Sequence, residues 1–134
     1  MIQCKRVYED ISEADGCRVL VDRLWPRGLS KAKLRLDAWL PEVAPSTQLR
    51  RQFAHEPEAF EAFEAFRTQY RAELAAHPEY WQGLLARAEQ GVLTLLFSAK
   101  DAQLNNARVL AEFLEDELER RGPPNSPVCY ADRM

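Results

Sequence analysis

The segment VLTLLFSA, residues 92–99, is the strongest strand signal in the chain. It is a continuous apolar run that follows Gly91 and leads into polar residues. A short apolar run bounded in this way is typical of a strand that is buried on both faces, as in the middle of a parallel sheet. We therefore predict a central strand at residues 92–99, around which the rest of the fold is arranged.

Two further strands are predicted near the N-terminus. Residues 2–8 (IQCKRVY) are rich in strand-forming side chains, and residues 17–22 (CRVLVD) form a more buried run. The intervening loop, residues 9–16, is shorter than the dozen residues that a parallel crossover requires. These two strands are therefore either antiparallel neighbours or not adjacent, and the sequence leaves both arrangements open.

Helical periodicity occupies the middle and the end of the chain. A helix is predicted from Ser46 or Thr47 to about His55, and Pro57 suits the first turn of the next helix. Apolar residues then recur every three or four positions, which indicates buried helix faces. They are Phe60, Phe63, Phe66, Tyr70 and Leu74, followed by Trp81, Leu84, Leu85 and Ala88. A last helix is expected over residues 101–121.

These elements predict an α/β fold with a small mixed, mostly parallel sheet packed with helices. A chain of 134 residues fits one domain. We expect that domain to span residues 1–134, with a short irregular tail after about residue 122 in which VCYAD could add an edge strand. Ser30 is predicted to cap a short helix, and Leu34, Trp39 and Leu40 are predicted core contacts.

Composition excludes several classes of protein. Hydrophobic residues make up 46% and charged residues 29% of the chain, as in ordinary globular proteins. No apolar run approaches the roughly 20 residues of a membrane span, so we expect a cytoplasmic protein without membrane association. Cys4, Cys17 and Cys129 are odd in number and lack CxxC spacing, which argues against a disulfide framework or a zinc site. No metal and no cofactor is expected, and the chain is either a monomer or a homodimer.

Positive charge is concentrated in the first part of the chain. Residues 18–51 hold eight Lys or Arg residues and three acids, a local net charge of +5, although the whole chain carries −3. Nucleic-acid-binding domains typically have a pI above about 9, whereas this chain has a pI near 5.5. We therefore expect a small anionic ligand, and nucleic acid is an unlikely partner.

The segment VDRLWPRG, residues 21–28, contains more charged and aromatic side chains than a turn requires. Pro26 and Gly28 suit the second and fourth positions of a type I turn. The turn leaves four residues of this segment unexplained, namely Asp22, Arg23, Trp25 and Arg27.

In an open α/β sheet, ligands bind at the carboxyl ends of the strands. If the strands at residues 17–22 and 92–99 are parallel, Arg23 and Arg27 can bind a carboxylate or phosphate at that edge. Trp25 would stack on the ligand, and Asp22 would hold an arginine or accept a proton. The structural alternative is an ion pair between Asp22 and an arginine, with Trp25 in the core.

The segment SAKD, residues 98–101, follows the central strand. Ser98 and Asp101 have the spacing of a capping box, which would begin the last helix at this point. A helix N-terminus also attracts anions, and Lys100 lies beside it in the sequence. The structural and the ligand-binding interpretations are compatible.

Three blocks in order resemble the domain-of-unknown-function 488 family, and specifically its YeaO-like branch: RVLVDRLWPRG, WLPEVAPSTQLRRQF and LTLLFSAKDAQLNNARVLAEFL. The resemblance covers nearly the whole chain and implies a small cytosolic α/β protein. Within the blocks, the matching positions outside residues 22–28 are Pro45, Ser46, Ser98, Asp101 and Asn105.

The wider family that the chain resembles often carries a thiol and a Cys-His-Arg run around its last strand and helix. In this chain the corresponding positions hold Phe97 and, at residues 105–107, Asn-Asn-Ala. The resemblance therefore implies ligand-binding positions without implying thiol chemistry.

We hypothesise a pocket at the carboxyl ends of the strands that binds a small anion, such as a phosphate, a carboxylate or a nucleotide. If the protein is an enzyme, Asp22 is the best candidate for the acid or base, and Arg23, Arg27 and Lys100 would stabilise charge. The alternative is a non-enzymatic module that binds an acidic protein or nucleic acid through a basic face. Convergence of these three cations in one concave site would favour the pocket.

Overall fold

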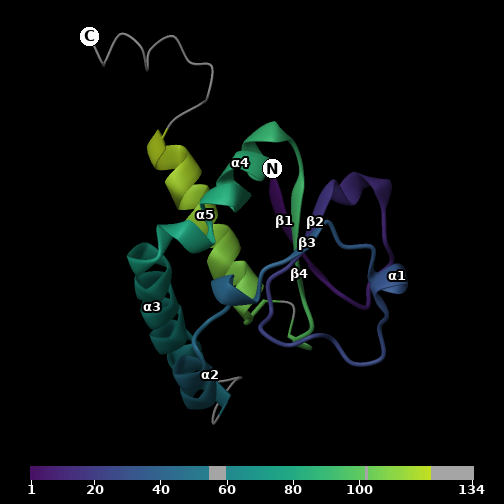
Figure 1. Cartoon of the computed structure of the whole chain (residues 1–134). Helices are drawn as coiled ribbons and strands as arrows, with labels where there is room; N and C mark the ends of the chain where they lie inside the picture. The colour runs from purple at the N-terminus through teal and green to yellow at the C-terminus, as the bar shows by residue number, and fades with distance from the viewer. Residues whose placement is uncertain (55–59, 102, 122–134) are drawn as a thin grey trace, which may run out of the picture.

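A computed structural model describes residues 1–54, 60–101 and 103–121, and it contains a four-stranded sheet (Figure 1). The strands are β1 (Ile2–Arg6), β2 (Cys17–Leu20), β3 (Ala38–Trp39) and β4 (Leu93–Phe97), in the order β1-β4-β2-β3. All three neighbouring pairs are parallel. The α/β prediction is confirmed, and the sheet is fully parallel.

The position of β4 agrees with its apolar sequence. It lies between β1 and β2, and its five residues are all buried. Because β4 separates them, β1 and β2 are not adjacent, which selects the second of the two arrangements that the short loop at residues 9–16 allows. A sheet of this kind requires its central strand to be apolar on both faces.

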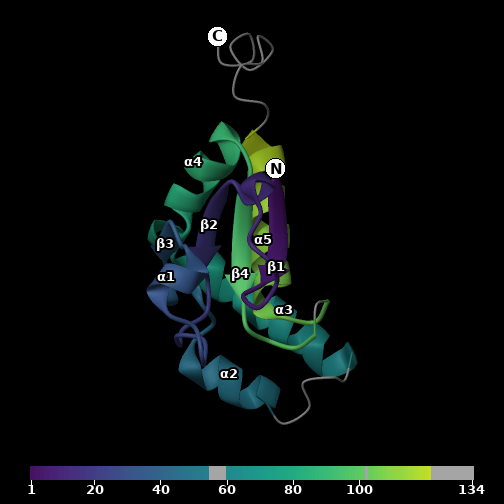
Figure 2. The same cartoon turned by 90° about the vertical axis from the view of Figure 1, so that its right-hand side faces the viewer.

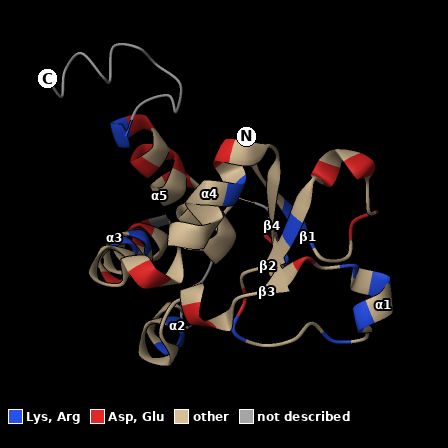
Figure 3. Cartoon of the chain, turned by 45° about the horizontal axis from the view of Figure 1, so that its top comes forward, with Lys and Arg blue, Asp and Glu red and all other residues tan. Residues whose placement is uncertain are grey.

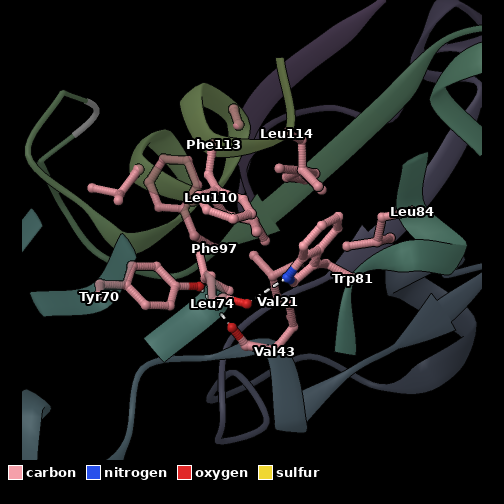
Figure 4. Close-up of a cluster of buried hydrophobic side chains, with 14 of the residues drawn as sticks. Val21, Val43, Tyr70, Leu74, Trp81, Leu84, Phe97, Leu110, Phe113 and Leu114 are labelled. Carbon is pink, nitrogen blue, oxygen red and sulfur yellow. Dashed lines mark hydrogen bonds between the residues drawn. The ribbon is translucent and has the colours of Figure 1, made fainter. Parts of the chain in front are cut away.

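One face of the sheet is covered by α4 (Gln82–Gln90) and α5 (Asn106–Arg121), and α3 (Phe60–Ala76) packs against α5 on the same side, as Figure 1 shows. The predicted stripe residues from Phe63 onward and the apolar residues of α4 are buried there. The polar atoms of the large aromatic side chains have partners in this core (Figure 4): the Tyr70 hydroxyl donates to the Val43 carbonyl, and the Trp81 indole donates to the Leu74 carbonyl, each at 2.7 Å. Burial of these side chains therefore leaves no unpaired donor.

The opposite face is thinly covered by the short helix α1 (Lys31–Leu34) and by loops. Its hydrophobic cluster consists of Val7, Leu20, Leu34 and Leu96. Ser30 caps α1 as predicted, because its hydroxyl accepts from the amide of Lys33 at 3.2 Å.

A buried charged network completes the thin face. Asp15 ends the 3₁₀ turn η1 (Glu13–Asp15), is 2% exposed and forms ion pairs with Lys5 and Arg18. The other end of the Arg18 guanidinium donates to the Leu34 carbonyl at 3.0 Å. The hydroxyl of Thr94, on β4, donates to the Asp15 carbonyl at 2.6 Å. The ion pairs and hydrogen bonds of this network thus join β1, β2, β4 and α1.

The helix before the aromatic stripe, α2 (Thr47–Ala54), begins where the sequence predicts. The Ser46 hydroxyl caps it by accepting from the Leu49 amide at 3.2 Å. Two 3₁₀ turns, η2 (Pro41–Val43) and η3 (Pro78–Tyr80), precede α2 and α4.

The predicted start of the last helix at residue 101 is wrong. The Asp101 carboxylate accepts from the amides of Gln103 and Leu104, which closes a local turn instead of a helix. The helix α5 begins at Asn106, and Asn105 caps it by accepting from the Arg108 amide at 3.0 Å.

Of the predicted core contacts, Leu34 is buried and Leu40 packs against the main core, but Trp39 remains 39% exposed. Its exposure follows from its position on β3, a two-residue strand at the sheet edge. Pro57, Cys129 and the segment VCYAD lie outside the described residues. Within the described ranges, no helix is long and apolar enough to cross a membrane.

Candidate site at the carboxyl ends of the strands

A cavity of about 450 Å³ opens at the carboxyl ends of β2 and β4. The strand register explains why two distant segments meet there. Leu20 pairs with Leu96, so Asp22 and Ser98, each two positions further along, leave the sheet at the same edge. The helix α2 lies below this edge in Figure 2 and contributes Arg50 and Phe53 to the cavity wall.

Asp22 acts as a hydrogen-bonded link between the two strand ends and α5. Its Oδ2 accepts from the Ser98 amide at 2.8 Å and from the Ser98 hydroxyl at 2.9 Å. Its Oδ1 accepts from the Asn106 side-chain amide at 3.0 Å. The carboxylate therefore has a structural function at both oxygens, and the alternative of an ion pair with Arg23 or Arg27 is not realised.

Arg23 is half-buried between the sheet edge and the start of α2. Its guanidinium donates to the carbonyls of Ala44 and Pro45 at 3.2–3.3 Å. These neutral acceptors leave its charge uncompensated, since no ion pair joins Arg23 to any acid in the described part of the chain. Arg23 therefore adds positive charge to the cavity wall while it holds the chain entering α2.

Arg27 lies on an ordered turn, but the type I prediction for that turn is wrong. The turn residues are Arg27 and Gly28, and Gly28 has a φ of +76°, which suits the third position of a type II turn. The Tyr8 hydroxyl donates to the Arg27 carbonyl at 3.1 Å and ties the turn to the end of β1. The Arg27 side chain is exposed and forms no hydrogen bond or ion pair with described residues.

Trp25 forms part of the same wall without entering the main core. Its indole nitrogen donates to the Leu29 carbonyl at 2.7 Å, and its ring packs edge-on against Trp39 with centroids 5.3 Å apart. The side chain is half-buried and lines the cavity. An apolar surface therefore lies next to the arginines.

Sequence reasoning gave too little weight to α2. Arg50 and Phe53 line the cavity together with Arg23 and Arg27, and Arg50 is exposed without an ion-pair partner in the described ranges. The signal was present in the sequence, because residues three apart on a helix share one face. Figure 3 shows the basic residues of this edge in blue on α2 and on the loop after β2.

The remaining predicted positions divide between inside and outside the cavity. Ser98 and Asn105 line it, but both are occupied in local bonds, Ser98 with Asp22 and Asn105 with α5 and the Asp101 carbonyl. Lys100 and Asp101 do not line the cavity. The hydrogen bonds from Leu104 and Gln103 that close the local turn lower the pKa of Asp101 below its ordinary value. The predicted capping box between Ser98 and Asp101 is wrong, because Ser98 bonds to Asp22, Asp101 bonds to Gln103 and Leu104, and α5 begins only at Asn106.

Ser46 lines a different cavity, of about 530 Å³, on the far side of Arg23. Its hydroxyl donates to Glu73 on α3 at 2.6 Å, and its backbone amide donates to the same carboxylate at 2.9 Å. Ser46 thus caps α2 and anchors it to α3. Arg23 lines both cavities, whereas Asp22, Trp25 and Arg27 line only the first and Ser46 lines only the second.

The first cavity has binding groups but few groups for acid–base or nucleophilic chemistry. Its ionisable lining residues in the described part of the chain are Tyr8, Asp22 and the three arginines. Neither described cysteine lines it, and burial raises the pKa of the Cys4 thiol to about 11. Phe97, which stands near the thiol position of the wider family, is buried in the core. Within the described ranges, no group of His, Cys, Asp and Glu side chains is arranged to hold a metal ion.

Several known proteins are similar in sequence to this chain along most of its length. The uncharacterised protein YeaO of Escherichia coli is 50% identical over 113 residues, which cover 84% of this chain and 96% of the relative. Uncharacterised proteins of Mycobacterium bovis and Mycobacterium tuberculosis are each 39% identical over 116 residues, covering 84% of this chain and 92% of theirs. No solved structure matches the chain. A family model described as the inactive DUF488-N3 subclade matches residues 1–131, and the chain belongs to that subclade.

Proposed function

We propose that this protein is a non-catalytic binding protein that holds a small organic anion in the cavity at the carboxyl ends of β2 and β4. One observation carries the proposal. Arg23, Arg27 and Arg50 come from separate segments, line one cavity and have no acid partner in the described part of the chain. Unpaired arginines that share a concave surface are suited to bind carboxylate or phosphate.

Some arginines outside the cavity have acid partners, and others do not. Arg18 is paired with Asp15, and Arg67 and Arg71 are paired with Glu112 across α3 and α5. Arg6, Arg35 and Arg51 also form no ion pair with a described residue, so what sets the three cavity arginines apart is that they share one concave surface. Clustering of uncompensated like charges raises the free energy of the free protein, and a bound anion would relieve that repulsion.

The binding assignment is supported over catalysis by two observations. Both Asp22 oxygens are engaged in structural hydrogen bonds, so the best candidate for an acid or base has a different role. The family description calls the subclade inactive. Concave placement of the arginines also supports a pocket over a flat basic face, although Lys100 lies outside it.

A thermal-shift titration with sodium phosphate, citrate and adenosine 5′-monophosphate tests the proposal. At a ligand concentration of about ten times the Kd, binding to the folded state should raise the Tm of the wild type by about 5 °C. The Arg27→Ala variant should lose most of that shift. The matched control is Arg51→Ala, which removes the same charge from an exposed position of α2 that does not line the cavity.

Equal shifts in both variants would show that the anions act through general charge effects and would contradict the proposed pocket. The absence of any shift with all three anions would also contradict it and would favour the interaction-module alternative.

A further inference from the structure

The cavity at the carboxyl edge is amphipathic as well as basic. Most of its wall is apolar, with side chains from the loop after β2, from α2 and from α3. Trp25 and Pro26 line it from the loop after β2, and Phe53 and Phe66 line it from α2 and α3. A site for a bare inorganic anion has no use for such a surface, whereas pockets for organic ligands are lined mainly by apolar and aromatic residues with a few polar groups.

The helix α2 presents both kinds of group side by side. Arg50 and Phe53 are three positions apart, so they lie on the same face of the helix, and both line the cavity. Phe53 is held in place by stacking on Phe66 of α3, with ring centroids 4.5 Å apart and an angle of 25° between the planes. An aromatic wall with a fixed orientation is therefore next to an arginine.

The charge balance of the wall indicates the charge of the ligand. The three arginines contribute three positive charges and Asp22 contributes one negative charge, which leaves a net charge of +2 on the described lining residues. A carboxylate would compensate half of it. A phosphate monoester carries about −1.5 to −2 charges at pH 7 and would compensate nearly all of it.

Besides the arginines, the wall holds a side-chain hydrogen-bond acceptor that is open to a ligand, Asn106 Oδ1. The side-chain nitrogen of Asn106 donates to the Val21 carbonyl and to Asp22, whereas its Oδ1 accepts no hydrogen bond from the described residues. Asn106 lines the cavity, so this oxygen is available to a hydroxyl or amino group on the ligand.

We infer that the ligand is a phosphate monoester that carries a flat ring, such as a nucleoside monophosphate or an aryl phosphate. The inference rests on the proposed function and specifies its ligand class. The phosphate binds Arg27 and Arg50, and the ring lies on the wall formed by Phe53 and Phe66. Nucleobases and simple aryl rings share this chemistry, because each offers a π-face for stacking.

Isothermal titration calorimetry with five probes tests the inference on the full chain. The probes are adenosine 5′-monophosphate, phenyl phosphate, ribose 5-phosphate, inorganic phosphate and adenosine. The two ring-bearing phosphates should bind about tenfold or more tightly than ribose 5-phosphate and inorganic phosphate, because stacking on an aromatic side chain adds affinity. Adenosine should bind more weakly than its monophosphate by a similar factor.

The outcomes separate this inference from the proposed function. Equal affinity for all four phosphates would overturn the ring-binding inference and leave the anion pocket intact. Equal affinity for adenosine and its monophosphate would overturn the phosphate assignment, and the absence of binding by every probe would overturn the inference together with the pocket.

A pair of variants locates the ring. Phe53→Leu removes a ring that lines the cavity, whereas Phe63→Leu removes a ring from the same aromatic cluster that does not line it. The affinity ratio of adenosine monophosphate to ribose 5-phosphate should fall about tenfold in Phe53→Leu and stay unchanged in Phe63→Leu. Equal ratios in both variants would contradict the placement of the ring on α2. If either variant fails to fold by circular dichroism, the wild-type probe series remains decisive.

Discussion

Two regions of this protein concentrate charged side chains, and they differ in whether the arginines have acid partners. In the network on the thin face of the sheet, Arg18 is buried against Asp15, and Lys5 adds a second ion pair. In the cavity at the carboxyl edge, Arg23, Arg27 and Arg50 have no acid partner within the described ranges. The first region satisfies its charges internally and holds elements together. The second leaves its arginines without acid partners among the described residues.

The difference shows how a structural ion pair can be told from a candidate binding group. Both regions are rich in arginine, and both lie within the positively charged segment at residues 18–51 or beside it. They differ in the hydrogen-bond partners of the arginines. Arg18 donates to a buried carboxylate and to carbonyl groups, whereas Arg23 donates only to neutral carbonyl groups. The variants described next test this contrast.

The largest effect is expected from Asp15→Ala. This change leaves Arg18 buried without its carboxylate and removes an ion pair from Lys5. Breaking a buried ion pair at one partner costs about 3–5 kcal/mol, so the free energy of unfolding in urea should fall by about that amount. Glu13→Ala, in the same 3₁₀ turn but exposed, is the control and should be nearly neutral. A small loss in Asp15→Ala would mean that the network does not hold the thin face together.

Replacing a glycine should destabilise the protein more beside the network than in the cavity turn. Gly16 adjoins the network, has a φ of +61°, and a Cβ there would lie 2.4 Å from the Val92 carbonyl oxygen. Gly28 in the cavity turn has a φ of +76° with open space around it. Gly16→Ala should therefore lower the free energy of unfolding by about 2–4 kcal/mol, and Gly28→Ala by about 1 kcal/mol. Urea denaturation of both variants measures the difference, and equal losses would show that the contact with Val92 relaxes at little cost.

Acid should weaken the network and leave the cavity arginines charged. Burial would raise the pKa of Asp15, but hydrogen bonds from Lys5, the Ser12 amide and Arg18 outweigh it, so the folded pKa lies below the ordinary 3.8. A depressed carboxyl pKa stabilises the fold at pH values above the unfolded pKa, and this contribution is lost as the pH falls from about 4 through the folded pKa.

Urea midpoints measured from pH 7 to pH 2.5 should show this loss in the wild type. The loss should be smaller in Asp15→Asn, which cannot titrate at that position. Arg27→Ala should follow the wild-type profile, because arginine stays protonated throughout. Parallel profiles for wild type and Asp15→Asn would contradict the assignment of the acid-sensitive contribution to Asp15.

The smallest effect on stability is expected at the cavity. Arg27→Ala and Arg50→Ala should change the free energy of unfolding by less than about 0.5 kcal/mol, because these exposed guanidinium groups have no partner to lose among the described residues. Chemical denaturation without added anions measures this. A loss above about 1 kcal/mol in either variant would place that arginine with Arg18 as a structural group.

Much of the fold could be predicted because it depends on local patterns. The apolar run of β4, the stripe on α3 and the caps at Ser30 and Ser46 depend on residues that are neighbours in the sequence. The start of α5 was predicted five residues too early, because Asp101 closes a turn with the same side chain that would have completed a capping box. Local chemistry allowed both structures there, and the bond between Ser98 and Asp22 removed Ser98 from the cap.

The candidate site was predicted only in part, for a similar reason. Asp22, Arg23, Trp25 and Arg27 stood out because a turn does not require them. Phe53 did not stand out, because a phenylalanine on a helix is an ordinary core residue, and the sequence did not separate Arg50 from Arg51, which does not line the cavity. Their significance comes from the placement of α2 across the strand ends, which is a long-range arrangement (Figure 2).

The order of residues alone is enough to indicate an α/β domain, its central strand, its buried helix faces and an excess of positive charge near one loop. Each of these depends on spacing along the chain or on composition. The neighbours of each charge were decided by the tertiary structure, because electrostatic compensation depends on distance in space. Asp15 neutralises Arg18 on one face, Asp22 binds Ser98 and Asn106 instead of an arginine, and the arginines of the carboxyl edge remain available for an anion.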